Sequence, residues 1–175
     1  KITEELVDRS RLSASPDTFN KSLARAYRAY EATLFANNCT DFAHLQSIVH
    51  NLLLHPEHCA TITREIRYVM VDEYQDTNYV QEQLLLKLTE PTGNLCVVGD
   101  EDQSLYRFRG ATVRNILEFP SRFAKCPVVR LTTNYRSHRA IVERYDRWMA
   151  SADWSNQGGV PFRFDKTIEA DAKGG

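Results

Sequence analysis

Several features are missing from this chain of 175 residues, and each absence excludes a class of protein. No apolar run approaches the roughly 18 residues that a membrane-spanning helix needs. No secretory signal peptide opens the chain. The four cysteines are scattered and form no Cys-x-x-Cys pair. This pattern argues against a disulfide framework and predicts a reducing compartment, the cytoplasm.

Glycine is also scarce, and the seven glycines nowhere form the pattern Gly-x-x-x-x-Gly-Lys-Ser/Thr. That loop supplies the backbone N–H groups and the lysine that hold nucleotide phosphates. Nucleotide chemistry in this chain would therefore need a phosphate loop from elsewhere. Because the chain begins at Lys1, we expect it to be a piece of a longer protein.

One group of residues could bind zinc: His50, His55, His58 and Cys59. Their spacing matches no standard zinc site, and Pro56 interrupts any helix that would join them. We therefore interpret this stretch as a polar loop.

Hydrophobic periodicity predicts helices over residues 15–38, 41–55, 79–88 and 138–149. In the second helix the apolar residues expected to face inward are Phe42, Leu45, Ile48, Val49 and Leu52. Short apolar runs predict buried strands at residues 67–71, 95–98 and 128–132, with a strand-like run at 160–164. The alternation predicts an α/β fold with a parallel sheet and crossover helices.

Two carboxylates, Asp72 and Glu73, directly follow the first predicted strand. Ligands of open α/β sheets bind just beyond the carboxyl ends of the strands. Adjacent acids at this place suit a magnesium-nucleotide site, in which one acid binds the metal and the other handles a proton.

The stretch after the second strand adds groups for phosphates and bases. Gly99 allows a tight turn beside a ligand, and Gln103 can bridge a terminal phosphate and an attacking water. Tyr106 and Phe108 alternate with arginines, including Arg109. Aromatic rings that stack on bases, next to guanidinium groups that hold phosphates, are typical of single-strand binding.

After the third predicted strand, Tyr135 can stack on adenine and Arg136 can reach the phosphate charge that develops during hydrolysis. The net charge of −1 counts against a nucleic-acid partner, but acids concentrate in residues 57–102 and arginines in residues 103–147. An acidic stretch suits a metal and a basic one suits phosphates. Solvated surface arginines are the alternative explanation of the basic stretch.

Three segments carry a family resemblance: DEYQDTN at 72–78, GDEDQSLYRFRG at 99–110 and TNYRS at 133–137. They resemble helicase motifs II, III and IV of the UvrD/Rep/PcrA group of superfamily-one DNA helicases. The resemblance implies a fragment of an enzyme that couples ATP hydrolysis to 3′–5′ translocation on single-stranded DNA and to duplex unwinding. It also implies ATP and Mg²⁺ as cofactors.

The resemblance further implies a role for each matching residue. Asp72 would bind magnesium, Glu73 would be the general base and Gln103 would sense the γ-phosphate, with Gln75 and Asp76 holding the site together. Tyr135 would stack on adenine and Arg136 would be the arginine finger. Single-stranded DNA would contact three residues: Tyr106, Phe108 and Arg109. The group usually has Trp where Phe108 stands, and phenylalanine also stacks on bases but with less area.

The family also implies a domain division. Residues 1–38 would end an inserted helical subdomain, and residues 39–125 would form the second half of the first RecA-like motor domain. Residues 126–175 would open the second motor domain, so the sheet is a partial RecA-like P-loop NTPase sheet. Two alternatives stay open: the helicase subunit of a helicase–nuclease complex, and a helicase-like scaffold that binds DNA without hydrolysis.

Overall fold

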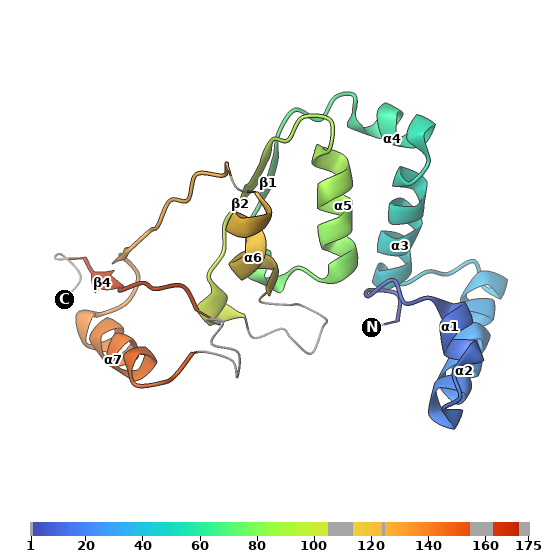
Figure 1. Cartoon of the computed structure of the whole chain (residues 1–175), viewed down its shortest axis with the longest axis horizontal. Helices are drawn as coiled ribbons and strands as arrows, with labels where there is room; N and C mark the ends of the chain where they lie inside the picture. Colours follow the sequence, from blue (N-terminus) through green and yellow to red (C-terminus); the bar gives the residue numbers. More distant parts are fainter. Residues whose placement is uncertain (1, 105–113, 124, 155–162, 172–175) are drawn as a thin grey trace.

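The computed structural model describes residues 2–104, 114–123, 125–154 and 163–171, and Figure 1 shows their arrangement. The elements follow in the order α1 (Arg9–Ala14), α2 (Thr18–Ala36), α3 (Phe42–Leu53), α4 (Pro56–Thr63), β1 (Val69–Val71), η1 (Tyr74–Asp76), α5 (Tyr79–Thr89), β2 (Leu95–Val97), η2 (Glu101–Gln103), α6 (Arg114–Arg122), β3 (Thr133–Asn134), α7 (Arg139–Ala150) and β4 (Glu169–Ala170). The prediction of a mixed α/β fold with parallel strands is confirmed.

Side-chain caps begin the helices that the sequence predicts. Asp17 accepts a hydrogen bond from Phe19 N at 2.9 Å and starts α2, and Asp41 accepts one from His44 N at 2.7 Å and starts α3. Asn78 and Gln81 form a reciprocal capping box at α5. Such caps satisfy N–H groups that have no partner within the helix. All four predicted helices are confirmed as α2, α3, α5 and α7.

Strands β1 and β2 pair in parallel, with Val69 opposite Leu95 and Val71 opposite Val97, and α5 forms the crossover between them. Met70 is 79% exposed, whereas its two neighbours in β1 are half-buried. The prediction of fully buried strands is therefore wrong, because the described part of the chain covers one face of this pair. That face packs on a core built around Tyr74, Ile116 and Phe119.

A partly buried ion pair joins α6 to α5 beside this core. Arg122 Nη1 lies 2.6 Å from Glu82 Oε1, and the Glu82 side chain is 4% exposed. Tyr74 donates its hydroxyl to the same oxygen at 3.2 Å. Burial and the Glu82 carboxylate raise the pKa of Tyr74, so its hydroxyl stays protonated and keeps donating. These contacts anchor η1, the turn that directly follows β1.

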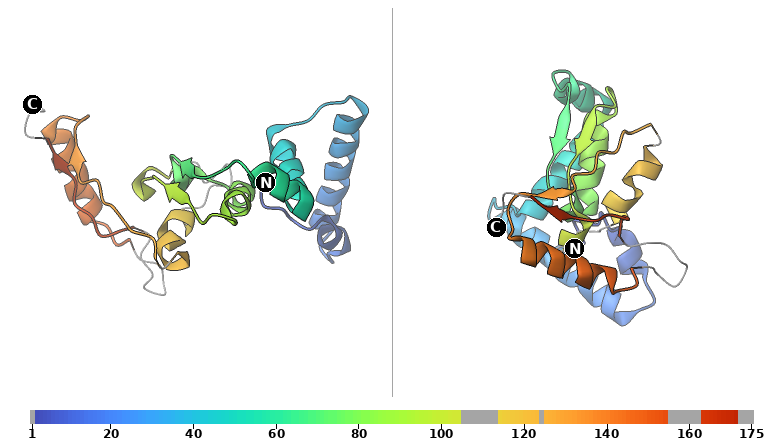
Figure 2. Two further views of the ribbon diagram at one scale, coloured as in Figure 1. Left: turned by 90° about the horizontal axis from the view of Figure 1, so that it is seen from above. Right: turned by 90° about the vertical axis from the view of Figure 1, so that its left-hand side faces the viewer.

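The third predicted strand is misplaced. Residues 128–132 form no strand, and Val129 and Leu131 are each 80% exposed. The strand forms at Thr133–Asn134 instead and pairs in parallel with β4, not with β1 or β2. Figure 2 shows this second pair beside α7. An apolar run forms a buried strand only where another strand pairs with it. Here the pairing strand is β4, in the tail, and it pairs with Thr133–Asn134 instead of residues 128–132.

Other predictions need correction. The stretch read as a polar loop is helical, since His50 lies in α3 and Pro56 begins α4, a position that proline favours. The face of α3 expected to point inward is open, with Phe42 84% exposed and Ile48 57% exposed. The α3 helix packs on α5, and its buried residues are Ser47 and Leu53. Residues 160–162 of the strand-like run lie outside the described residues.

Helices α1, α4 and α6 and strand β4 were not predicted from the sequence. Among the described helices, none combines the length and the apolar character needed to cross a bilayer.

Candidate functional site

The first predicted site residues lie where β1 ends and the chain turns into η1. Asp72 Oδ1 accepts a hydrogen bond from Glu73 N at 3.0 Å, and both residues are exposed. The backbone of Glu73 has φ 50° and ψ 44°, in the left-handed region that residues other than Gly, Asn and Asp rarely adopt. Such strain persists where surrounding contacts enforce it, and it is concentrated at functional sites.

The enforcing contacts come from Gln75, which is 1% exposed. Its amide nitrogen Nε2 donates to Glu73 Oε2 at 2.6 Å, and its amide oxygen Oε1 accepts from Asp100 N at 3.0 Å. Asp100 Oδ2 in turn accepts from Gln103 Nε2 at 2.8 Å. A continuous hydrogen-bonded path therefore joins Glu73 to Gln103, through residues that follow β1 and β2. We call it the Glu73–Gln103 path.

Gly99 makes this path sterically possible. A Cβ atom built at Gly99 would lie 2.4 Å from Gln75 Oε1 and 2.8 Å from Ile116 Cδ1. Real Cβ atoms do not approach other atoms so closely, so residue 99 must be glycine for Gln75 to reach Asp100 N. The structure thus shows a close approach of Gly99 to Gln75, and the expected turn beside a ligand at Gly99 stays a prediction.

The carboxylates at the end of β1 have the chemistry that the predicted cofactors need. Asp72 Oδ2 makes no hydrogen bond within the described residues, which leaves one oxygen for a hard cation. Magnesium commonly binds through one or two carboxylates together with phosphates and waters, so an exposed aspartate at a strand end fits it. Glu73 Oε1 is likewise not engaged in the described part of the chain, and it can accept a proton from water.

Tyr135 and Arg136 lie elsewhere. They follow β3, where Asn134 Oδ1 accepts hydrogen bonds at 2.9 Å from the backbone N of Arg136 and of Ser137. Both predicted site residues are exposed, Tyr135 to 78%. Within the described residues, the Arg136 side chain makes no hydrogen bond or ion pair to the carboxylates after β1. The structure thus joins Glu73 with Gln103 and does not bring Arg136 or Tyr135 to them.

Three further predicted residues, Tyr106, Phe108 and Arg109, lie outside the described residues. Their predicted contact with single-stranded DNA stays a prediction.

Sequence reasoning missed the cation that meets the acids around η2. Asp100, Glu101 and Asp102 each offer a carboxylate oxygen within 4.8 Å of the others. Lys166 Nζ lies between them, 2.5 Å from Asp100 Oδ1 and 3.1 Å from both Glu101 Oε2 and Asp102 Oδ2. Lys166 belongs to a tail that carries no recognisable motif, and only the fold brings it to these acids.

Parallel strands joined by a crossover helix, with a carboxylate pair at a strand end, define an α/β protein. In open sheets of this class, ligands bind at the carboxyl edge. Residues 1–124 match the family model described as the UvrD/REP helicase N-terminal domain. The chain belongs to this family.

Several curated relatives are similar to the chain. The ATP-dependent DNA helicase UvrD1 of Mycobacterium tuberculosis is 38% identical over 153 residues, 81% of this chain and 20% of that protein. The ATP-dependent DNA helicase PcrA of Bacillus subtilis is 40% identical over 125 residues, 71% of this chain and 17% of that protein. A probable DNA helicase II homolog of Rickettsia felis is 42% identical over 138 residues, 76% of this chain and 21% of that protein. The chain spans about a fifth of the length of these relatives.

Proposed function

We propose that this chain is part of an ATP-dependent DNA helicase that translocates 3′ to 5′ on single-stranded DNA and unwinds duplex DNA. The observation that carries the proposal is the Glu73–Gln103 path. It links a candidate base at the end of one parallel strand to a candidate phosphate sensor after the next. The named function of the relatives, ATP-dependent DNA helicase, supports the same conclusion.

Each end of the path has a role in this proposal. Asp72 would hold Mg²⁺, whose chemistry is to neutralise phosphate charge when it is bound. Glu73 accepts the proton of the attacking water at Oε1, while Gln75 holds Oε2 and keeps the carboxylate oriented. Gln103 senses the γ-phosphate, and a change there passes through Asp100 and Gln75 to Glu73, at the turn after β1.

The remaining site residues complete the proposal. Tyr135 and Arg136 act from the second motor domain, which residues 126–175 begin, and meet the nucleotide when the two motor domains close. Their exposure leaves their side chains available for that contact. Tyr106, Phe108 and Arg109 contact single-stranded DNA. Residues 39–125 then form half of a RecA-like domain, with the helical segment 1–38 before it.

The substitution Glu73→Gln in the full-length protein that carries this chain tests the proposal. We expect ATP hydrolysis to fall by at least about a hundredfold, because general-base contributions reach about 10²–10⁴. Nucleotide affinity should change little, since glutamine keeps the side-chain volume and the bond from Gln75. Turnover is measured by phosphate release with and without single-stranded DNA, and affinity by titration of a fluorescent ATP analogue.

Glu65→Gln is the matched control, because Glu65 is 87% exposed and lies outside the site. Its turnover should equal that of the unsubstituted protein. Retained hydrolysis in Glu73→Gln, or equal loss of binding and turnover, would remove Glu73 from the role of base. A protein without ATP hydrolysis even before substitution would favour the DNA-binding scaffold.

A further inference from the structure

The turn η2 concentrates negative charge in a poorly solvated place. Three consecutive residues, Asp100, Glu101 and Asp102, carry carboxylates, and the side chains of Glu101 and Asp102 are 3% and 4% exposed. Like charges at this spacing repel one another, and their burial is costly unless cations compensate. The turn that carries Gln103 therefore depends on cations supplied by another part of the chain.

Those cations come from the segment that precedes β4. Lys166 contacts all three carboxylates, and Arg163 Nε donates to both oxygens of Asp102 at 2.9 Å and 3.0 Å. Both cations are themselves mostly buried, at 13% and 11% exposure. Tyr145, from α7, donates its hydroxyl to Asp102 Oδ2 at 2.7 Å. We call Arg163, Lys166 and Tyr145 the η2 clamp.

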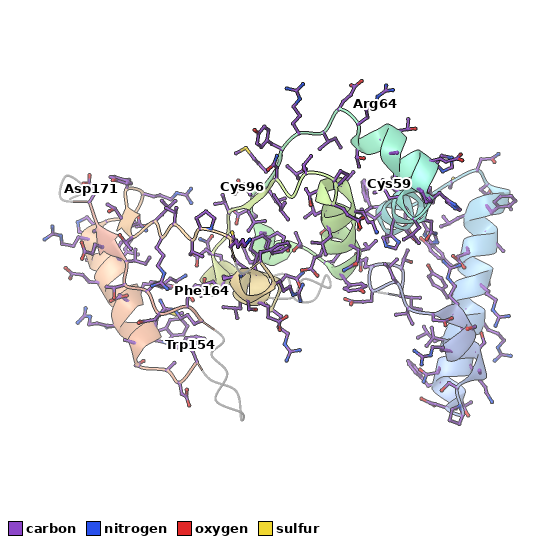
Figure 3. All side chains as sticks on the ribbon, turned by 45° about the horizontal axis from the view of Figure 1, so that its top comes forward. Cys59, Arg64, Cys96, Trp154, Phe164 and Asp171 are labelled. Atoms are coloured by element: carbon purple, nitrogen blue, oxygen red, sulfur yellow. The ribbon has the colours of Figure 1, made fainter. Side chains whose placement is uncertain are left out.

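Phe164 fixes the same segment to the core that packs on β1 and β2. Its backbone N donates to Glu101 Oε1 at 2.9 Å, and its ring packs against the cluster of Tyr74, Ile116 and Phe119. Figure 3 labels Phe164 close to the centre of the molecule, away from the outer end of the tail at Asp171. The clamp is thus seated on the η2 turn by packing as well as by charge.

The clamp also connects to the other half of the proposed site. Lys166 lies three residues before β4, and β4 pairs with β3 through Glu169 and Thr133. Tyr135 and Arg136 directly follow β3. A short path therefore leads from the strand before Arg136, across β4, to Lys166 and then to Asp100, which accepts the hydrogen bond from Gln103.

We infer that Lys166 is a positioning residue: with Arg163 it holds the η2 turn so that Gln103 is presented to the nucleotide, and it transmits movement of the β3–β4 pair to Gln103. This inference rests on the proposed helicase function. Lys166 touches neither substrate nor metal in it. Its action is exerted through Asp100, whose Oδ1 binds Lys166 while Oδ2 binds Gln103.

The charge states agree with this arrangement. Burial lowers the pKa of Lys166, but its contacts with Asp100 and Glu101 outweigh burial and raise the pKa overall. Burial raises the pKa of Asp102, and the contacts with Arg163, Tyr145 and Lys166 outweigh it and lower the pKa. Lys166 and Asp102 are therefore both charged near neutral pH.

The substitution Lys166→Met in the full-length protein tests the inference by a split between kinetic constants. We expect DNA-stimulated kcat for ATP to fall about tenfold, while the KM for ATP changes less than about twofold, because Gln103 acts on turnover rather than on initial binding. Lys166→Arg keeps the charge and should restore most of the activity. A merely structural lysine would lower the melting temperature without this split.

Lys87→Met is the matched control. Lys87 Nζ lies 2.9 Å from Glu90 Oε2, so the variant also removes a lysine–carboxylate pair, but on the outer surface of α5. Its kinetic constants should equal those of the parent. If Lys166→Met does not fold, the double variant Glu101→Gln with Lys166→Met carries the test, because it removes a buried carboxylate together with the cation and leaves Asp100, the acceptor of the Gln103 bond, in place. That variant should also show the loss in kcat.

The outcomes separate the two proposals. Unchanged kcat in a folded Lys166→Met or in the double variant overturns the positioning role, provided that Glu73→Gln still abolishes hydrolysis. If the full-length protein hydrolyses no ATP even before substitution, the proposed function fails and the positioning role fails with it.

Discussion

At the scale of single residues, the site depends on one glycine as much as on its acids. Gly99 leaves the space in which Gln75 Oε1 reaches Asp100 N at 3.0 Å. Gly99→Ala should lower the free energy of unfolding of the chain by about 1–3 kcal/mol, because an added methyl must displace Gln75 or Ile116. Urea denaturation measures the stability, and the NMR signal of the Gln75 side-chain amide should shift as its bonds to Glu73 and Asp100 break.

Gly93→Ala is the control for that prediction. Gly93 has φ +67°, and nothing lies within 4 Å of a Cβ built there. Alanine should therefore cost about 1 kcal/mol through backbone strain alone and leave the Gln75 signal in place. An unshifted Gln75 amide in Gly99→Ala would contradict the account of the path.

The sequence predicted some site residues and missed others for physical reasons. The places of Asp72, Glu73 and Gln103 beyond the carboxyl ends of β1 and β2 could be predicted, since each follows an apolar run. The bridging hydrogen bonds of Gln75 could not, because they need the close approach at Gly99. Lys166 reaches Asp100 across 66 positions of chain, and neither periodicity nor spacing reports such a contact.

At the scale of elements, a polar cluster joins α2 to α3 at Asp41. Asp41 Oδ1 accepts from His44 N at 2.7 Å and lies 3.0 Å from His44 Nδ1, and Tyr30 donates its hydroxyl to Oδ2 at 2.5 Å. Partial burial raises the pKa of Asp41, but the hydrogen bonds from Tyr30 and His44 lower it to about 2. The ionised form is therefore the one that stabilises the fold.

This shift predicts a pH-dependent effect of Asp41→Asn. A carboxyl whose pKa is lower in the folded state stabilises at pH above its unfolded value, about 3.9, and this stability is lost as the pH falls toward 2. At pH 7 Asp41→Asn should cost about 1 kcal/mol, allowing for solvent screening of a partly exposed group. Asparagine still caps a helix, so the difference measures the charge.

Denaturant unfolding of both proteins between pH 3 and pH 7 makes the comparison. The difference in unfolding free energy between the unsubstituted protein and Asp41→Asn should decrease steadily below pH 4. A gap that is constant across this range would show that the Asp41 charge is not stabilising. Asp17→Asn is the control, because Asp17 caps α2 through a single bond to Phe19 N and should show a smaller gap.

The predicted elements succeeded where local signals suffice. Helices α2, α3 and α5 begin at capping side chains, and caps and periodicity are properties of neighbouring residues. Helix α6 was missed although its apolar residues recur at helical spacing. The reason is Pro120 within it, because proline is a strong signal against a helix. The third strand was misplaced because strand pairing depends on a partner in the tail, at β4.

At the scale of the whole molecule, burial was the least predictable property. A compact monomer of 20.1 kDa has a solvent-accessible surface of roughly 8,700 Å². The solvent-accessible surface of this chain is larger, at 12858 Å². Periodicity marked Phe42 and Ile48 as inward-facing, yet both are exposed. An amphipathic pattern identifies the face that needs a cover, but only the assembled fold determines whether a cover is present.

The isolated chain is expected not to hydrolyse ATP. The path from Glu73 to Gln103 lies within these 175 residues, but the pattern Gly-x-x-x-x-Gly-Lys-Ser/Thr does not. Without converging N–H groups and a lysine, the β- and γ-phosphates have no cradle, so the isolated chain should release no phosphate from ATP above background. Phosphate release with and without single-stranded DNA measures this, with the full-length protein as positive control and Glu73→Gln as blank. The contrary outcome is DNA-stimulated turnover by the isolated chain, with loss of that turnover in Glu73→Gln. It would mean that these 175 residues hold the triphosphate by themselves. The proposed division of the site between two parts of a longer protein would then be wrong.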